Sequence, residues 1–103
     1  MRIVAEYRRF VGEDREYVLS KQLLRSGTFI GANIAEANQA QSRPDFISKL
    51  SIALKETVET EYWLELLRDS RYLDQDTAEA MLAECRELKA ILTASIKSSK
   101  LRL

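Results

Sequence analysis

Apolar residues recur every three or four positions along four stretches of this 103-residue chain, and this spacing is typical of amphipathic helices. Glycine and proline, the residues that interrupt helices, number only three and one. We find no stretch in which apolar and polar residues alternate as they would in a half-buried strand. The sequence therefore predicts an all-α fold with helices over about 2–11, 15–40, 43–71 and 75–99.

Short polar residues mark where these helices should begin. Asp14 is expected to cap the second helix and Asp74 the fourth. Ser42, followed by Pro44 and Asp45, forms a capping box for the third helix. Because the breaks between helices are short, consecutive helices should run antiparallel in an up-down four-helix bundle that occupies 1–103 as one domain. At 1.5 Å per residue the first helix should be only about 16 Å long.

The second helix carries small residues four positions apart on one face, at Gly27, Gly31 and Ala35. Glycine inside a helix costs about 0.5–1 kcal/mol relative to alanine, so this spacing needs a reason. A phosphate-binding loop does not fit, because no strand precedes these residues. Close helix packing fits better, either in the inner core or at an interface with another subunit. The candidate packing and oligomer interface comprises Gly27, Ile30, Gly31, Ile34, Ala35, Tyr62 and Trp63.

The third helix has a broad apolar surface. One stripe runs through Phe46, Leu50, Ala53, Thr57, Leu64 and Leu67, and a second runs through Ile47, Leu54, Val58 and Tyr62. Two stripes predict contact with more than one neighbouring helix. Tyr62 and Trp63 point about 100° apart, so one of them should pack in the core and the other should lie at a subunit interface.

The chain has no histidine and one cysteine, Cys85, which is expected to be a small buried hydrophobe. Histidine-dependent triads and the Glu-x-x-His pairs of di-iron bundles are therefore excluded. Carboxylates on the second and third helices could still form a metal or acid–base site. The favoured interpretation is a structural polar network that fixes helix register, and it comprises Asn33, Glu36, Glu56 and Glu59 together with Arg25 or Lys55. We expect no catalytic residue, no metal and no cofactor.

The formal net charge is zero, but the charges are unevenly distributed. Residues 45–87 carry five basic and eleven acidic side chains, whereas residues 88–103 carry four basic side chains and no acidic one. Such segregation usually reflects solvated helix faces. Subunits that bring basic ends together could nevertheless bind phosphates. The candidate nucleic-acid-binding residues are Arg8, Arg9, Arg15, Lys21, Arg25, Lys97, Lys100 and Arg102.

Three segments, SKQLLRSGTFIGANIAEA (20–37), DFISKLSIALKET (45–57) and EYWLELL (61–67), resemble the four-helix-bundle proteins of the 23S rRNA intervening-sequence family. The accessory variability determinant of diversity-generating retroelements is a relative of that family. The resemblance implies an antiparallel four-helix bundle that assembles into a ring, typically a homopentamer. The retroelement relative binds nucleic acid and a reverse transcriptase through basic surfaces, whereas members encoded in ribosomal RNA genes have no settled activity. Family members usually carry a longer first helix, so either Met1 is an internal start or part of that helix has been lost.

These observations favour a non-catalytic, oligomeric protein of the cytoplasm that binds nucleic acid or a nucleic-acid-processing enzyme. The chain has neither a secretory signal nor an apolar stretch long enough to span a membrane. A protein-only scaffold for an unknown partner is the alternative. A metal enzyme that uses carboxylates is a second alternative.

Overall fold

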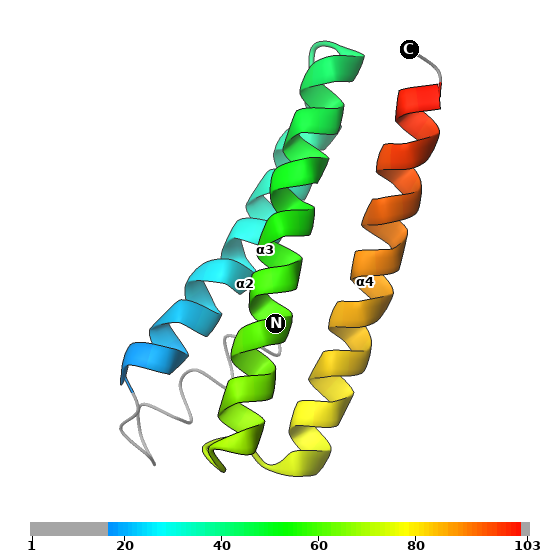
Figure 1. Ribbon diagram of the computed structural model, residues 1–103. Helices are drawn as coiled ribbons and strands as arrows, with labels where there is room; N and C mark the ends of the chain where they lie inside the picture. Colours follow the sequence, from blue (N-terminus) through cyan, green and yellow to red (C-terminus); the bar gives the residue numbers. More distant parts are fainter. Residues whose placement is uncertain (1–16, 102–103) are drawn as a thin grey trace.

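The computed structural model describes residues 17–101, which form three long helices and no strand: α2 (Tyr17–Asn38), α3 (Arg43–Asp69) and α4 (Gln75–Leu101). α3 packs against both α2 and α4, and the chain reverses direction between consecutive helices (Figure 1). The bounds lie close to the last three stretches in which the apolar spacing predicts helices. The predicted helix over 2–11 and the predicted cap Asp14 lie outside the described residues.

The two predicted caps within the described part are present. Ser42 is the N-cap of α3, and its Oγ accepts a hydrogen bond from the backbone N–H of Asp45 at 3.2 Å. Asp74 Oδ2 accepts from the backbone N–H of Thr77 at 3.0 Å, and its carbonyl accepts from Ala78 at 2.8 Å. Each cap satisfies a backbone donor that would otherwise lack a partner in the first turn of its helix.

The core consists of two apolar clusters along α3. One cluster joins the end of α3 to the beginning of α4 and contains Leu23, Leu64, Leu67, Leu73, Ala78, Met81, Leu82 and Cys85, with Trp63 packed on it. The other contains Ala37, Ile47, Leu50, Ala53, Leu92 and Ile96, with Ile34, Phe46, Leu54 and Leu88 at its edge. Thr57 and Thr60 lie on α3 between the two clusters and are fully buried. Each cluster therefore holds all three described helices together.

The second apolar stripe predicted on α3 is only partly buried. Ile47 is buried and Leu54 is half-buried, but Val58 and Tyr62 are 49% and 57% exposed. The predicted contact of α3 with more than one neighbouring helix is confirmed, although the second half of this stripe takes no part in it. α2 and α4 occupy two sides of α3, and Val58 and Tyr62 lie on the side that neither helix covers within the described part.

None of the helices within 17–101 is long and apolar enough to cross a membrane.

α3 ends in a left-handed residue that is not glycine. Arg71 has a φ of 65°, and the next two residues, Tyr72 and Leu73, both donate backbone hydrogen bonds to the carbonyl of Leu67. Helices commonly end in this geometry with glycine at the left-handed position, because a Cβ is strained there.

Replacement of Arg71 by glycine should stabilise the fold. We expect the free energy of unfolding to rise by about 0.5–1 kcal/mol, once the larger freedom of glycine in the unfolded chain is counted. Urea denaturation followed by circular dichroism measures this change. Ser70→Gly is the matched control, because Ser70 has a right-handed φ of −83° and glycine there should destabilise. An Arg71→Gly variant no more stable than the parent would contradict the strain argument.

Candidate functional site

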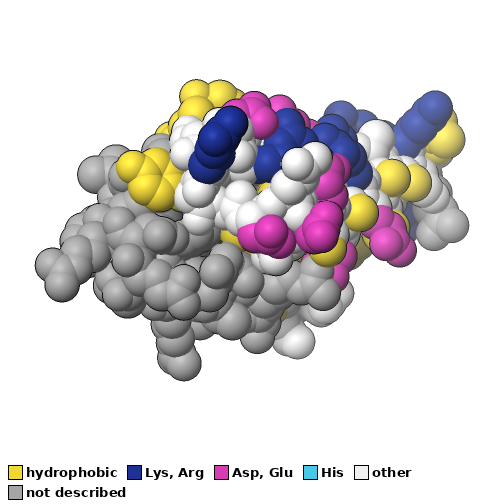
Figure 2. All heavy atoms as spheres, turned by 90° about the horizontal axis from the view of Figure 1, so that it is seen from below, with side chains coloured by type: hydrophobic (Ala, Val, Ile, Leu, Met, Phe, Trp, Pro, Cys, Tyr) yellow, Lys and Arg dark blue, Asp and Glu magenta, His cyan; other side chains and the backbone are white. Residues whose placement is uncertain are grey.

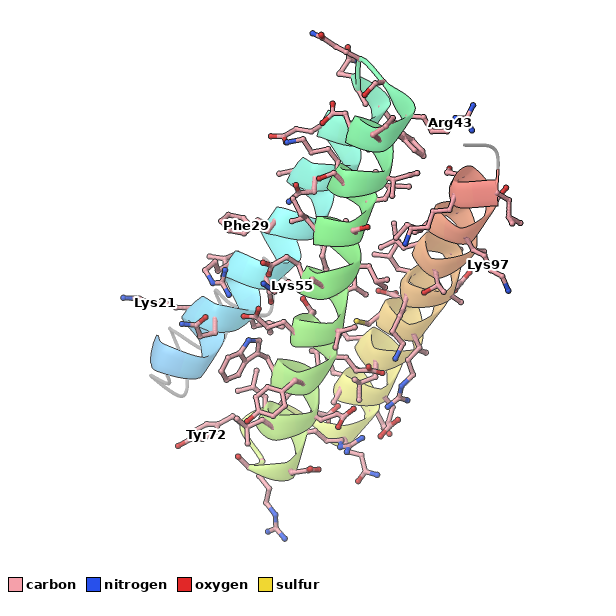
Figure 3. The ribbon with its side chains drawn as sticks, turned by 45° about the horizontal axis from the view of Figure 1, so that its top comes forward. Lys21, Phe29, Arg43, Lys55, Tyr72 and Lys97 are labelled. Atoms are coloured by element: carbon pink, nitrogen blue, oxygen red, sulfur yellow. The ribbon has the colours of Figure 1, made fainter. Side chains whose placement is uncertain are left out.

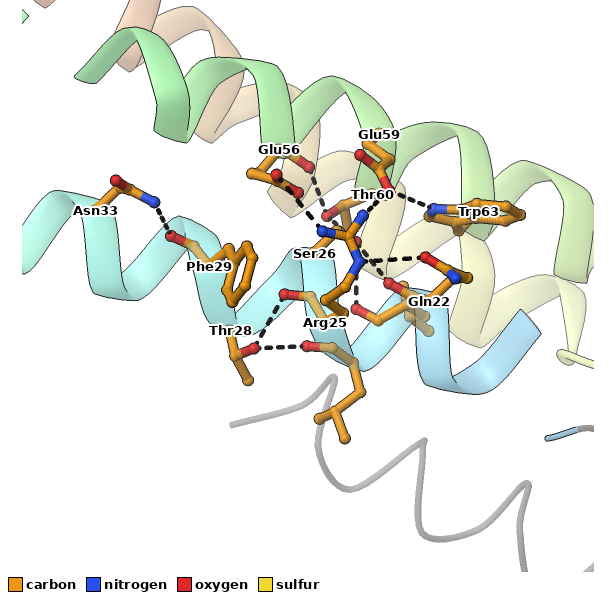
Figure 4. Close-up of polar contacts among 12 residues, drawn as sticks. Gln22, Arg25, Ser26, Thr28, Phe29, Asn33, Glu56, Glu59, Thr60 and Trp63 are labelled. Carbon is orange, nitrogen blue, oxygen red and sulfur yellow. Dashed lines mark hydrogen bonds and ion pairs between the residues drawn. The ribbon is translucent and has the colours of Figure 1, made fainter. Parts of the chain in front are cut away.

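Arg25 of α2 lies between two carboxylates of α3 (Figure 4). Its guanidinium forms an ion pair with Glu59, and its Nη1 lies 3.8 Å from Glu56 Oε1. Trp63 Nε1 donates to the same Glu59 oxygen at 3.2 Å, and Gln22 Oε1 accepts from Arg25 Nε at 3.2 Å. The guanidinium is thus held by side chains from both helices, and this arrangement fixes how α2 lies along α3.

A buried hydroxyl contact lies directly beneath this ion pair. Thr60 Oγ1 of α3 is 2.9 Å from Ser26 Oγ of α2, and both side chains are almost completely buried. Each hydroxyl also reaches a carbonyl of its own helix, Gln22 for Ser26 and Glu56 for Thr60. Both hydroxyls therefore have hydrogen-bond partners although they are buried. Ser26 and Thr60 form a polar contact between the two apolar clusters.

Glu56 is the least satisfied member of this network. The residue is 8% exposed, and its Oε2 is buried and has no hydrogen-bond partner within the described part of the chain. Its nearest cation, Arg25, is shared with Glu59 and lies closer to that carboxylate. A buried oxygen without a partner costs about 1–3 kcal/mol, so the stability of this region depends on Arg25.

The structure separates the polar network that the sequence predicts into independent contacts. Glu56 and Glu59 meet at Arg25, as the favoured interpretation expects. Asn33 instead donates to the carbonyl of Phe29 on its own helix, and Glu36 forms an ion pair with Lys49 at 3.1 Å. Lys55 is exposed and has no ion pair with any described residue, so neither it nor Asn33 and Glu36 belongs to the Arg25 network. Within 17–101 no three acidic or cysteine side chains are close enough together to hold a metal ion.

A second ion-pair network joins α3 to α4. Glu61 Oε1 accepts from Lys89 Nζ at 2.8 Å, and its Oε2 accepts from Arg86 Nε at 2.9 Å. The hydrogen bond from Lys89 and the one from Arg86 lower the pKa of Glu61 below its ordinary value. The carboxylate therefore stabilises the contact between the two helices while it is ionised.

Cys85 lies on the inner face of α4, as the sequence predicts. It is buried, and its Sγ donates to the carbonyl of Thr57 at 3.2 Å. Burial raises the pKa of the thiol to about 11, so the thiolate is scarce at neutral pH. These properties are those of a packing residue rather than a nucleophile.

The strip of small residues on α2 is not uniformly packed. Gly27 is buried, but Gly31 and Ala35 are exposed, and a Cβ added at Gly31 would meet nothing within 4 Å. The inner-core alternative is therefore wrong for Gly31 and Ala35 in the single chain, because no described helix approaches them. Ile30 is buried and Ile34 half-buried, so part of this candidate interface already belongs to the core. Trp63 packs on the core, as expected for one member of this pair, and Tyr62 is exposed, so its place at a subunit interface stays a prediction.

The predicted basic residues do not form one patch. Lys21 lies near the beginning of α2, whereas Lys97 lies at the other end of the molecule, in the last turns of α4 with Lys100 (Figure 3). Arg25 is bound to Glu56 and Glu59 and is not free for a ligand. The end at which α3 finishes and α4 begins carries acidic and basic side chains next to one another (Figure 2). The remaining candidates, Arg8, Arg9, Arg15 and Arg102, lie outside the described residues.

The fold adds one basic residue that the sequence analysis missed. Arg43 at the beginning of α3 and Ser99 near the end of α4 line the same hollow of about 480 Å³. Lys97 and Lys100 line a neighbouring hollow of about 310 Å³ together with Leu54. We call Arg43, Lys97 and Lys100 the basic end; none of the three forms an ion pair with a described residue. The short loop between α2 and α3 is the feature of the sequence that could have indicated this position of Arg43. A short loop there places the beginning of α3 at the same end of the molecule as the last turns of α4.

Comparison with known proteins gives a family and a crystal structure that are similar to this chain. The 23S rRNA-intervening sequence protein family matches residues 1–94. A crystal structure of a protein with unknown function from the S23 ribosomal protein family of Bacteroides thetaiotaomicron has a TM-score of 0.91 and 55% sequence identity. That match covers 93% of this chain and 89% of the Bacteroides chain. No curated protein matches the chain.

Replacement of Arg25 by methionine should destabilise the fold by about 1–3 kcal/mol, because it leaves the buried Glu56 without a nearby cation. The double variant Arg25→Met with Glu56→Gln should recover part of this loss, since a neutral amide needs no counter-ion. Urea denaturation of all variants gives the free energies of unfolding. Lys21→Met is the control on the same helix, because Lys21 is exposed and has no ion pair with a described residue, so its replacement should change stability by less than about 0.5 kcal/mol. Equal stability of the Arg25 and Lys21 variants would refute the role of Arg25.

Replacement of Glu61 by glutamine should change the pH dependence of stability. Because the pKa of Glu61 is lowered in the folded state, its contribution is present above the pKa of an unfolded glutamate, about 4.3, and is lost as the pH falls through the folded value. We expect the parent to exceed Glu61→Gln by about 1–2 kcal/mol at pH 7 and by nothing in strong acid. Glu87→Gln, at an exposed residue without a described partner, should show no such trend. A constant difference between parent and Glu61→Gln at every pH would contradict the assignment.

Proposed function

Because the chain belongs to the 23S rRNA-intervening sequence protein family, we propose that it is a non-catalytic helical protein that assembles with copies of itself and binds nucleic acid. The observation that carries this proposal is the basic end, where Arg43, Lys97 and Lys100 lie without carboxylate partners in the described part. Cations without partners are available to phosphates, whereas Arg25, Arg68 and Arg86 are held by glutamates or aspartates. The name of the family, which refers to 23S rRNA, makes RNA the first ligand to test.

Assembly is the second component of the proposal. Three basic side chains in one subunit can make only a few phosphate contacts and should bind nucleic acid weakly. A ring of subunits would increase the number of such contacts. The exposed strip around Gly31 and Ala35 is the candidate subunit interface, because small residues let a neighbouring backbone lie close. The proposed assembly is an antiparallel four-helix bundle, completed by a helix over 2–11, that forms a ring of five copies in the cytoplasm. A nucleic-acid-processing enzyme is a further candidate partner, by resemblance to the accessory variability determinant.

A protein-only scaffold is the second candidate function. It is favoured by large apolar side chains that lie exposed on more than one helix, among them Phe29 at 45% and Ile91 at 55%. Such residues, when they gather on one face, mark surfaces that contact other proteins. This candidate requires no affinity for nucleic acid.

A binding titration with structured RNA and with duplex DNA tests the proposal. The three phosphate contacts of one subunit alone predict that affinity falls roughly 20–40-fold between 50 and 200 mM salt, and contacts from further subunits of a ring would make the fall steeper. Lys97→Glu with Lys100→Glu should reduce affinity at least tenfold, because it reverses two of the three charges at the basic end. Lys21→Glu, at the opposite end, is the matched control and should bind like the parent. No affinity at the lower salt concentration, or affinity indifferent to salt, would exclude nucleic-acid binding and favour the scaffold.

Gly31→Leu separates assembly from ligand binding in the same titration. A side chain at Gly31 meets open space in the single chain, so the helices should remain folded. If the strip is the subunit interface, light scattering should show a smaller particle and the affinity for RNA should fall with it. An unchanged particle mass would show that the strip is not the subunit interface. The test of nucleic-acid binding at the basic end would remain valid.

A further inference from the structure

α3 carries a row of side chains on the face that α2 and α4 leave largely uncovered, of which Lys55, Val58 and Tyr62 are exposed and Glu65, at the edge facing α4, is half-buried. Lys55, Val58, Tyr62 and Glu65 follow one another at intervals of three, four and three residues, so they lie within an arc of about 80° on the helix. We call these four residues the outer stripe. A helix that packs on its other sides normally shows a polar outer face, and Val58 and Tyr62 interrupt that pattern.

The apolar middle of the outer stripe has no cover within the described part of the chain. Val58 and Tyr62 are about half exposed, and Tyr62 makes an edge-to-face contact with its chain neighbour Trp63, at a centroid distance of 5.0 Å. Adjacent exposed apolar residues on one face of a rigid helix are typical of a contact surface. The core cannot use these residues, because Leu64 and Thr57 fill the opposite face of the same turns.

Opposite charges flank this apolar middle. Lys55, near the middle of α3, is exposed and has no ion pair with a described residue (Figure 3). Among the described residues Glu65 forms one ion pair, a long one of 3.6 Å to Arg86 Nη2, while Arg86 places its Nε 2.9 Å from Glu61. The outer stripe is therefore basic at one end and acidic at the other, and neither charge is fully compensated.

This order of residues is complementary to itself when two copies of α3 lie antiparallel. A two-fold axis at the level of residue 60 places Lys55 opposite Glu65 of the second copy, since both are five residues from 60. The same axis places Val58 opposite Tyr62, since both are two residues from 60. A parallel arrangement would instead place Lys55 against Lys55 and Glu65 against Glu65. Two-fold contacts of this kind use one patch on both subunits.

We infer that the outer stripe is a docking surface for a second copy of this chain, with the two α3 helices antiparallel. Charge complementarity identifies the second copy as the occupant, because the surface supplies both halves of each contact. The surface is narrow, one helix face wide, so the contact should be weak and depend on protein concentration. It uses neither the basic end nor the strip around Gly31, and so it goes beyond the proposed function and stands independently of it.

Zero-length carbodiimide cross-linking tests the inference on the full chain. An equal mixture of unlabelled and heavy-nitrogen-labelled protein is cross-linked at high concentration and digested for mass spectrometry. We expect a Lys55–Glu65 peptide that joins labelled to unlabelled chains. The two residues are about 15 Å apart along one helix, so this link cannot form within a molecule. Lys21, equally exposed and without an ion pair to a described residue, is the internal control and should give no link to Glu65.

Charge exchange identifies the contact specifically. Lys55→Glu and Glu65→Lys each remove one of the two reacting groups, so neither single variant should give the 55–65 link, and both serve as blanks for the assay. The double variant Lys55→Glu with Glu65→Lys should restore the yield, with the link now running from Lys at 65 to Glu at 55. Circular dichroism checks that each variant is folded. Absence of the mixed-isotope link in the parent, or failure of the double variant to restore it, would overturn the inference.

The same cross-linking of Gly31→Leu keeps this inference apart from the proposed function. The Lys55–Glu65 link should persist in that variant whether or not the ring is lost. If the link disappears together with the ring, the link belongs to the ring interface. That result would overturn the inference that the outer stripe forms a separate contact. A failure to bind RNA would leave the link unchanged.

Discussion

The packing of α2 and α4 onto two sides of α3 is the contact on which the described structure depends. Leu64 and Leu67 of α3 lie in one apolar cluster, and Leu50 and Ala53 lie in the other. Each cluster receives side chains from all three helices. α2 and α4 pack mainly against α3 rather than against each other, so the position of every surface feature follows from the two faces of this central helix.

Polar contacts then decide how the helices lie along one another. Apolar packing alone tolerates sliding by a turn, since leucine and isoleucine fit many neighbours. Arg25 with Glu59 on one side of α3, and Glu61 with Lys89 on the other, each favour one register, because displacement would leave charges unpaired. Glu56 shows the cost of this arrangement, since its second oxygen is buried without a partner. A specific register is thus obtained at the expense of some stability.

The same distribution of charges separates the surfaces available for function. Cations held by carboxylates, such as Arg25 and Arg68, serve the fold. Those without described partners include the basic end at one tip of the molecule, Lys21 near the other end, and Lys55 on the outer face of α3. The proposed function and the inferred contact therefore use different parts of one surface.

Local features were readable from the sequence. The apolar spacing located three helices, and Ser42 and Asp74 marked two of their beginnings, because caps and amphipathic faces depend on residues only three or four positions apart. The sequence also identified Cys85 as buried and grouped Glu56 with Glu59 in one polar network, for which Arg25 was one of two candidate basic partners.

Only the tertiary structure decided which apolar stripe of α3 is covered by the other helices. It leaves Val58 and Tyr62 exposed. It also paired Glu36 with Lys49, left Gly31 in open space and brought Arg43 beside the end of α4. These outcomes depend on residues far apart in the chain, and the spacing within one helix does not determine which neighbour lies against which face.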